Sequence, residues 1–243
     1  MDRMIYLSMS GAKATMQRQD LLSNNLANAS TTGFRAELQA FRAVPVRGDG
    51  ATTRAYALET TTGYDPAPGP VTATGRPLDV ALQGRAWLAL QAPDGSEAYT
   101  RAGALTVDAQ GQLMSLGGLP VLGEGGPITV PPGAEPSIAP DGTVSARQAN
   151  GSFIPVGRLK LVTPEAPLQR GEDSLFRTAD GNPLDADPAA RLQDGALEGS
   201  NVSAIGTMVA MIAAARQFEQ QLKLLGHAER NEDNAAKLLS VDR

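Results

Sequence analysis

The sequence contains no cysteine and a single histidine among its 243 residues. A chain without cysteine can form neither a disulfide framework nor a thiolate metal site, and it has no thiol nucleophile. The lone histidine, His227, has no partner residue at a metal-binding spacing, and no serine lies in a Gly-x-Ser-x-Gly elbow. These absences favour a protein with no catalytic residues, no metal ligands and no cofactor; an enzyme is the disfavoured alternative.

Basic charge and long apolar runs are also scarce. Lys and Arg total 21 against 26 Asp and Glu, which gives a formal net charge of −5, so no basic excess is present to neutralise nucleic-acid phosphates. No stretch approaches the roughly 18 uninterrupted apolar residues of a membrane span. Asp2, Arg3 and Lys13 leave no room for the apolar core of a secretory signal. We therefore expect no nucleic-acid partner, no membrane insertion and no cleaved signal peptide.

Aromatic residues are few, whereas turn-forming residues are many. Phe, Trp and Tyr make up 4% of the chain, against 26 glycines and 17 prolines. Apolar and alternating runs, such as Trp87–Gln91 and Thr143–Arg147, are separated by turns such as Pro140-Asp141-Gly142. This pattern predicts a turn-rich antiparallel barrel or sandwich in the middle of the chain.

The strongest helical periodicity extends from Asn201 to Leu225, and beyond Gly226 a looser pattern stays compatible with a helix to about Ser240. Ser200 or Asn201 is expected to cap this helix, and Ile205, Val209 and Ile212 widen its apolar stripe. A long core helix of one domain would show the same periodicity. The residues that follow the 4-3-4-3 spacing of a helix packed along other helices are Ala204, Met208, Met211, Ala215, Phe218, Leu222 and Leu225.

A weaker amphipathic helix is predicted over residues 3–27. It ends near Asn28, where asparagines, hydroxyls and a glycine compete for the backbone hydrogen bonds. Asn24, Asn25 and Asn28 either terminate this helix or form amide hydrogen bonds between subunits that fix their register. The apolar seam of the helix consists of Ile5, Met9, Ala12, Met16 and Leu26, with Leu22 flanking it.

Together these patterns predict an α+β fold. Long N- and C-terminal α-helices are expected to pair in a coiled-coil-like manner, and a central antiparallel β-rich domain is expected to be joined to them by extended connectors. The expected divisions are 1–41 for the N-terminal helix and turn, 42–77 for an extended connector, 78–163 for the β domain, 164–199 for a return connector and 200–243 for the C-terminal helix, the first and last forming one helical domain.

Short motifs are distributed along nearly the whole chain: Ser23–Asn28, Thr31–Phe34, Thr74–Leu82, Tyr99–Gly103, Asp108–Leu113, Gly118–Gly123, Ile138–Gly142 and Leu197–Val202. In this order they resemble the motifs of the axial proteins of the bacterial flagellum, the rod and hook family. Two local differences are Gly84–Leu88, where the family has a glycine and paired phenylalanines, and Ala102, where asparagine is common.

The resemblance implies a structural subunit of the flagellar basal body, which polymerises through its terminal helices into the hollow periplasmic rod. Met1–Tyr6 and Arg216–Glu219 are most similar to proximal-rod members. The implied partners are copies of the chain, other proximal and distal rod proteins, and the flagellar type III export apparatus, which exports such subunits without a cleaved signal. The alternatives are a sibling axial subunit of the distal rod or hook, and a non-flagellar β-rich binding module.

These inferences together predict a subunit interface on the two terminal helices. Its residues are Ile5, Met9, Ala12, Met16, Leu22, Asn24, Asn25, Leu26, Asn28, Ala204, Met208, Met211, Ala215, Phe218, Leu222 and Leu225.

Overall fold

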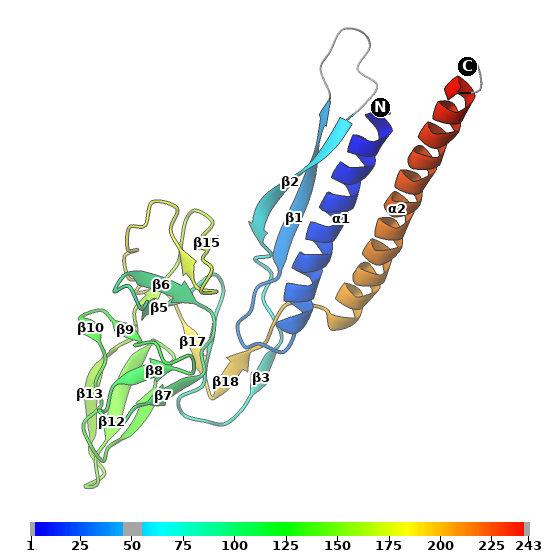
Figure 1. Cartoon of the computed structure of the whole chain (residues 1–243). Helices are drawn as coiled ribbons and strands as arrows, with labels where there is room; N and C mark the ends of the chain where they lie inside the picture. The colour runs from blue at the N-terminus through cyan, green and yellow to red at the C-terminus, as the bar shows by residue number, and fades with distance from the viewer. Residues whose placement is uncertain (1–2, 46–54, 241–243) are drawn as a thin grey trace. The chain divides into compact units, whose positions relative to one another are not determined.

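A computed structural model describes residues 3–45 and 55–240 of the chain (Figure 1). It consists of two compact units. Unit 1 contains Met1–Asn28, Glu37–Thr62 and Val202–Arg243, and unit 2 contains Ala29–Ala36 and Gly63–Asn201. Each unit is therefore assembled from segments that lie far apart in the sequence.

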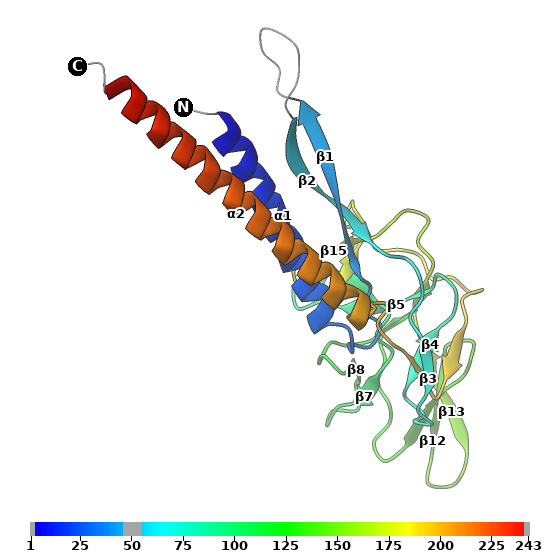
Figure 2. The same cartoon turned by 90° about the vertical axis from the view of Figure 1, so that its right-hand side faces the viewer.

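Unit 1 holds both helices. Helix α1 (Arg3–Ala27) and helix α2 (Ala204–Ser240) lie side by side, as Figure 2 shows from a second direction. Strand β1 (Glu37–Pro45) contacts α1 and pairs with β2 (Ala55–Tyr64) in a two-stranded sheet. Neither helix, as described, is both long enough and apolar enough to cross a membrane.

The start of α2 differs from the expected cap. The helix begins at Ala204, and the hydroxyl of Ser203 accepts a hydrogen bond from the Gly206 amide at 3.2 Å. Ser203 is therefore the N-cap residue, because a cap side chain accepts from an amide two or three residues ahead. Asn201, which was expected to cap the helix, makes its side-chain hydrogen bonds within unit 2.

Unit 2 is built from small antiparallel sheets. The largest has the strand order β14-β5-β6-β16-β15, and β11-β12-β13 form a second sheet. The remaining pairs are β3 with β18, β4 with β17, β7 with β8, and β9 with β10. The strand bounds are β3 Val71–Ala73, β4 Val80–Leu82, β5 Trp87–Gln91, β6 Glu97–Thr100, β7 Leu105–Val107, β8 Leu113–Ser115, β9 Leu122–Gly123, β10 Gly126–Pro127, β11 Glu135–Ile138, β12 Thr143–Arg147, β13 Phe153–Arg158, β14 Leu161–Val162, β15 Gln169–Arg170, β16 Phe176–Arg177, β17 Leu192–Asp194 and β18 Ala196–Glu198.

Strand β5 supplies both hydrophobic clusters of unit 2. Leu88 and Leu90 point to one face and join the larger cluster, whereas Trp87 and Ala89 point to the other face and join an aromatic cluster. This division follows from the two-residue period of a strand. In the aromatic cluster the rings of Trp87 and Phe176 have centroids 4.7 Å apart. The only tryptophan of the chain is therefore a core residue of unit 2.

The predicted fold class is wrong. The described residues form more strand than helix, with one helix near each end, and the segments expected to be extended connectors carry paired strands. Residues 42–77 include β2 and β3, and residues 164–199 include β15 to β18. These strands are mostly two or three residues long, too short for a period-two signal, and their partners are distant: Ala73 pairs with Ala196. The central strands lie where the turns and runs predicted them.

Candidate functional site

The helices of unit 1 meet through small and polar side chains. On α2, Ala214 and Ala228 are buried and Gln221 between them is half-buried. On α1, a Cβ atom at Gly11 would lie 3.1 Å from the Cδ atom of Gln221. Small residues let two helix backbones approach closely, so this face of α2 contacts α1. Several larger apolar side chains, such as Ile205 and Val209, are left exposed on other faces.

The spacing of this contact face is the predicted 4-3 repeat, but its phase is different. On α2 a 4-3 repeat of half-buried and buried residues consists of Ala204, Thr207, Met211, Ala214, Phe218, Gln221, Leu225 and Ala228. Ala204, Met211, Phe218 and Leu225 also belong to the predicted seam. The other three members of that seam, Met208, Ala215 and Leu222, sit one position away from the repeat, and Met208 and Leu222 are about half exposed, at 51% and 48%. The periodicity therefore gave the spacing and half of the contact positions.

Large apolar side chains remain exposed on both helices. We call them the outer apolar residues, and the most exposed is Ile205 at 78%. Four of them lie within the first turns of α2 at spacings of three and four residues, so they form one continuous stripe. A contiguous exposed apolar surface of this kind marks an interaction site. The outer apolar residues are Tyr6, Met9 and Met16 on α1, and Ile205, Met208, Val209, Ile212, Leu222 and Leu224 on α2.

The sequence-predicted interface residues therefore occupy three environments. Met9, Met16, Asn24, Met208 and Leu222 are exposed. Asn25 alone among them is buried. The half-buried ones are Ile5, Ala12, Leu22, Leu26, Asn28, Ala204, Met211, Ala215, Phe218 and Leu225. Tyr6 and Leu224 had no place in the predicted patterns, because a single exposed apolar residue gives no periodic signal.

The asparagines near the end of α1 make hydrogen bonds within unit 1. The Asn25 side chain donates to the Glu37 carbonyl at 3.0 Å and accepts from the Glu37 amide at 2.9 Å. Asn25 thus connects α1 to the start of β1 through both the nitrogen and the oxygen of its side-chain amide. Asn28 donates to the Asn24 carbonyl at 2.9 Å, which continues the helical hydrogen bonds past the last turn.

Unit 2 contains a buried ion network centred on Glu198. One carboxylate oxygen lies 2.6 Å from Nη2 of Arg35 and also accepts from the Gly69 amide at 3.0 Å. The other accepts from Nε of Arg101 at 2.8 Å. All three charged side chains are no more than 2% exposed. Arg35, Arg101 and Glu198 lie within or directly after three of the family-like motifs, so the network brings those motifs together.

The second arginine of the network is also held by backbone carbonyls. Arg101 donates to the carbonyls of Leu82, Gly84 and Ala86 at 2.6 to 2.9 Å. Burial lowers the pKa of the Arg101 guanidinium, and its pairing with Glu198 opposes that shift. A buried charge is tolerated when it is paired and its donors are satisfied. Arg101 therefore cross-links β4, the following turn and β18.

A glycine lets the N-terminal motif approach this network. Gly33 has φ +69°, and its amide donates to the Glu198 carbonyl at 2.8 Å. A Cβ atom there would lie 2.3 Å from the backbone nitrogen of Ala102. No side chain fits at that distance, so Gly33 is required both for its backbone conformation and for the close contact.

Asn201 joins three segments of unit 2. Its side-chain oxygen accepts from the Ala36 amide at 2.7 Å, and its side-chain nitrogen donates to the carbonyls of Asp65 and Ala67 at 3.1 and 2.9 Å. Ala36 lies in the segment after α1, Asp65 and Ala67 lie in the segment after β2, and Asn201 itself lies in the segment before α2. The residues that follow and precede the helices are therefore fixed to one another by a single amide.

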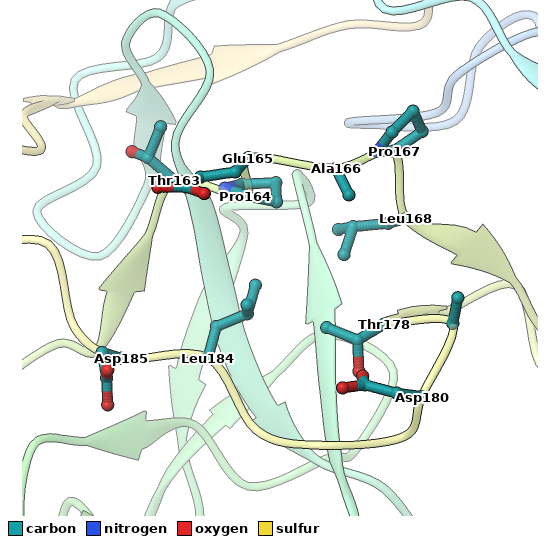
Figure 3. A pocket seen from close by; sticks show the side chains of 11 residues that line it. Thr163, Pro164, Glu165, Ala166, Pro167, Leu168, Thr178, Asp180, Leu184 and Asp185 are labelled. Carbon is teal, nitrogen blue, oxygen red and sulfur yellow. The ribbon is translucent and has the colours of Figure 1, made fainter.

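Unit 2 also has an open pocket of about 470 Å³, shown in Figure 3. Leu168 and Leu184 provide apolar surface, and the carboxylates of Glu165, Asp180 and Asp185 line the pocket with no basic residue among its lining residues. A concave site that combines apolar walls with a few polar groups suits the binding of a ligand or a side chain.

Comparisons with known proteins agree with the motif resemblance. The family described as "Flagella basal body rod protein" matches residues 5–35, "Flagellar hook protein FlgE/F/G D1 domain" matches 81–146, and "Flagellar basal body rod FlgEFG protein C-terminal" matches 193–238. The chain belongs to the family of flagellar basal-body rod proteins. It is a structural subunit of the rod and not an enzyme, and it is a component of the flagellar basal body.

Individual relatives are similar over their whole length. The chain is 49% identical to the flagellar basal-body rod protein FlgF of Escherichia coli (strain K12) over 251 residues, covering 99% of this chain and 100% of the relative. It is 50% identical to FlgF of Salmonella typhimurium, with the same coverage. The rod protein FlgG of Buchnera aphidicola subsp. Schizaphis graminum is 30% identical, over 93% of this chain and 95% of the relative.

Proposed function

We propose that the chain is a proximal-rod subunit that polymerises with copies of itself and with other proximal and distal rod proteins through its two helices. The observation that carries the proposal is the exposure of the outer apolar residues in the single chain. Removing apolar surface from water contributes about 25 cal/mol per Å², so contacts in which neighbouring subunits cover these side chains would stabilise the assembly. The identity of 49% and 50% to the FlgF proteins of Escherichia coli and Salmonella typhimurium, over nearly the full length of both chains, supports a proximal position.

The polymer requires a contact that does not close on itself. An outer face on one helix pair that fits a different face of the next copy is a heterologous contact, which generates an open helical assembly. The sequence-predicted interface residues that are exposed, such as Met9, Met16 and Met208, belong to this proposed contact. The half-buried ones would line its edge. Export through the type III apparatus and a periplasmic position of the rod complete the proposal.

The proposal is tested by placing a charge in the outer stripe of α2. Val209→Asp should abolish or strongly reduce motility when it replaces the native chain in cells, because an unpaired carboxylate would be buried against a neighbour. The purified variant should unfold like the native chain, since Val209 is 62% exposed. Gln220→Asp, at an exposed polar position of the same helix, is the matched control and should preserve motility. Normal motility of Val209→Asp would contradict the proposal.

A further inference from the structure

The β12–β13 hairpin of unit 2 presents an exposed aromatic side chain beside a cation. Phe153 is 64% exposed, and its direct cross-strand neighbour is Arg147. On its other side Arg147 is paired in register with Glu135 of β11, yet Arg147 forms no ion pair or side-chain hydrogen bond among the described residues. Ile154 follows at 38% exposure. The strand pattern puts Ala146 and Val144 of β12 into the core and leaves Arg147 and Phe153 on the solvent face.

The hairpin is held in shape by its own turn. Gly151 has φ +84°, and its amide donates to the Gln148 carbonyl at 2.8 Å. The side-chain oxygen of Asn150 accepts from the Ser152 amide at 2.9 Å and from the Ser152 hydroxyl at 2.6 Å. A surface that is ordered before binding loses little entropy on binding. Phe153 and Arg147 are thus displayed at a fixed position.

The pocket of Figure 3 has the complementary chemistry. Glu165 and Asp185 are exposed at its rim and form no ion pair among the described residues, and Asp180 is held there by the Asn182 side chain at 2.7 Å. The backbone amide of Leu184 donates to the Tyr99 hydroxyl at 2.7 Å, which fixes one apolar wall. Arg85 donates to the carbonyl of Pro164, one of the lining residues, at 3.0 Å.

We propose that the hairpin of one copy inserts Phe153 into this pocket of the next copy, with Arg147 facing the rim carboxylates. Phe153 and the apolar walls supply burial, and the opposite charges orient the contact. The hairpin and the pocket are different surfaces of the same unit, so their contact is heterologous and repeats along an open polymer. The inference rests on the proposed polymerisation and adds a second contact, made by unit 2, to the one made by the helices.

Disulfide cross-linking tests the contact in assembled rods, since the native chain has no cysteine. Phe153→Cys and Ala166→Cys chains, produced together in cells that lack the native chain, should form a disulfide-linked dimer on oxidation, which neither variant forms alone. Leu116→Cys with Ala166→Cys is the control, because Leu116 is 75% exposed on another turn of unit 2. A missing Phe153 dimer, or an equal Leu116 dimer, would overturn the inference.

Charge reversal gives a second measurement in the same cells. Adding Arg147→Glu to the Phe153→Cys chain should lower the dimer yield by about tenfold, because like charges then face each other. Adding Glu165→Lys to the Ala166→Cys chain should restore most of the yield. An unchanged yield in both cases would contradict the assigned role of Arg147.

Failure of this inference is distinguishable from failure of the proposed function. Met16→Cys and Val209→Cys chains, produced together, report the contact between helices of neighbouring copies. A helix dimer without a Phe153–Ala166 dimer would remove the hairpin contact and leave the rod assembly in place. Absence of both dimers would remove the assembly itself.

Discussion

At the scale of single residues, Glu198 is the centre of the buried ion network of unit 2. Its carboxylate joins Arg35 and Arg101, and its side chain is 1% exposed. Arg35, Arg101 and Glu198 lie far apart in the sequence. Local motifs contain or adjoin these residues, but they do not show that the two arginines pair with the glutamate. A three-dimensional arrangement is needed to show that three separate motifs share one ion network.

Replacing that carboxylate should destabilise the protein strongly. Glu198→Gln leaves two buried guanidinium groups without a counter-charge, and removal of one partner of a buried ion pair costs about 3 to 5 kcal/mol. Urea unfolding followed by the fluorescence of Trp87, the only tryptophan and a core residue of unit 2, measures this cost. Glu172→Gln, at an exposed position of the same unit, is the control and should change the unfolding free energy little. Equal effects of the two substitutions would contradict the role given to the network.

Gly33 allows a similar test with a matched glycine. Gly33 and Gly75 have φ +69° and +71°, but a Cβ atom at Gly75 would meet nothing within 4 Å. Gly75→Ala should therefore cost only the backbone strain of about 1 to 2 kcal/mol. Gly33→Ala should cost at least about 2 kcal/mol more, because its Cβ atom would overlap the Ala102 backbone. Similar unfolding free energies for the two variants would show that the close contact is not required.

At the scale of elements, the sequence predicted some features closely and missed others for physical reasons. The bounds of α1 follow from its periodicity and from the asparagines at its end. The spacing of the α2 contact face was also predictable. Its remaining positions were not, because periodicity does not show which of two adjacent stripes, the one with Met208 and Leu222 or the one with Ala214 and Gln221, faces the other helix. The two- and three-residue strands of the expected connectors are defined by distant partners and have no local signal.

Replacing a small buried residue of α2 with a larger one should destabilise unit 1. Ala214 is 1% exposed, so Ala214→Leu would force the helices of unit 1 apart and destabilise it by about 1 to 3 kcal/mol. Ala213→Leu, one residue earlier and exposed, should leave stability nearly unchanged. Thermal unfolding followed by far-UV circular dichroism compares the two variants. If Ala213→Leu were the more damaging, the assigned contact face of α2 would be wrong.

At the scale of the whole molecule, the chain combines two requirements. In unit 2, the buried charges of Arg35 and Arg101 pair with Glu198, and the apolar side chains pack in the two clusters around β5. The helices of unit 1 bury the small residues Ala214 and Ala228 in their own contact and leave several large apolar residues exposed. Because the chain belongs to a family of rod proteins, we interpret these exposed apolar side chains as surfaces that neighbouring subunits cover. The sequence predicted an interface on both helices, but the structure was needed to show which apolar side chains are exposed on them.

The most direct test compares the accessibility of the outer stripe in the free chain and in the rod. Val209→Cys gives the protein a single thiol at a position that is 62% exposed. The account predicts rapid maleimide labelling of the free, folded chain and strong protection in isolated basal bodies, with full labelling restored once the basal bodies are denatured. Equally rapid labelling in intact basal bodies would show that no neighbour covers the stripe, and would contradict polymerisation through the outer apolar residues.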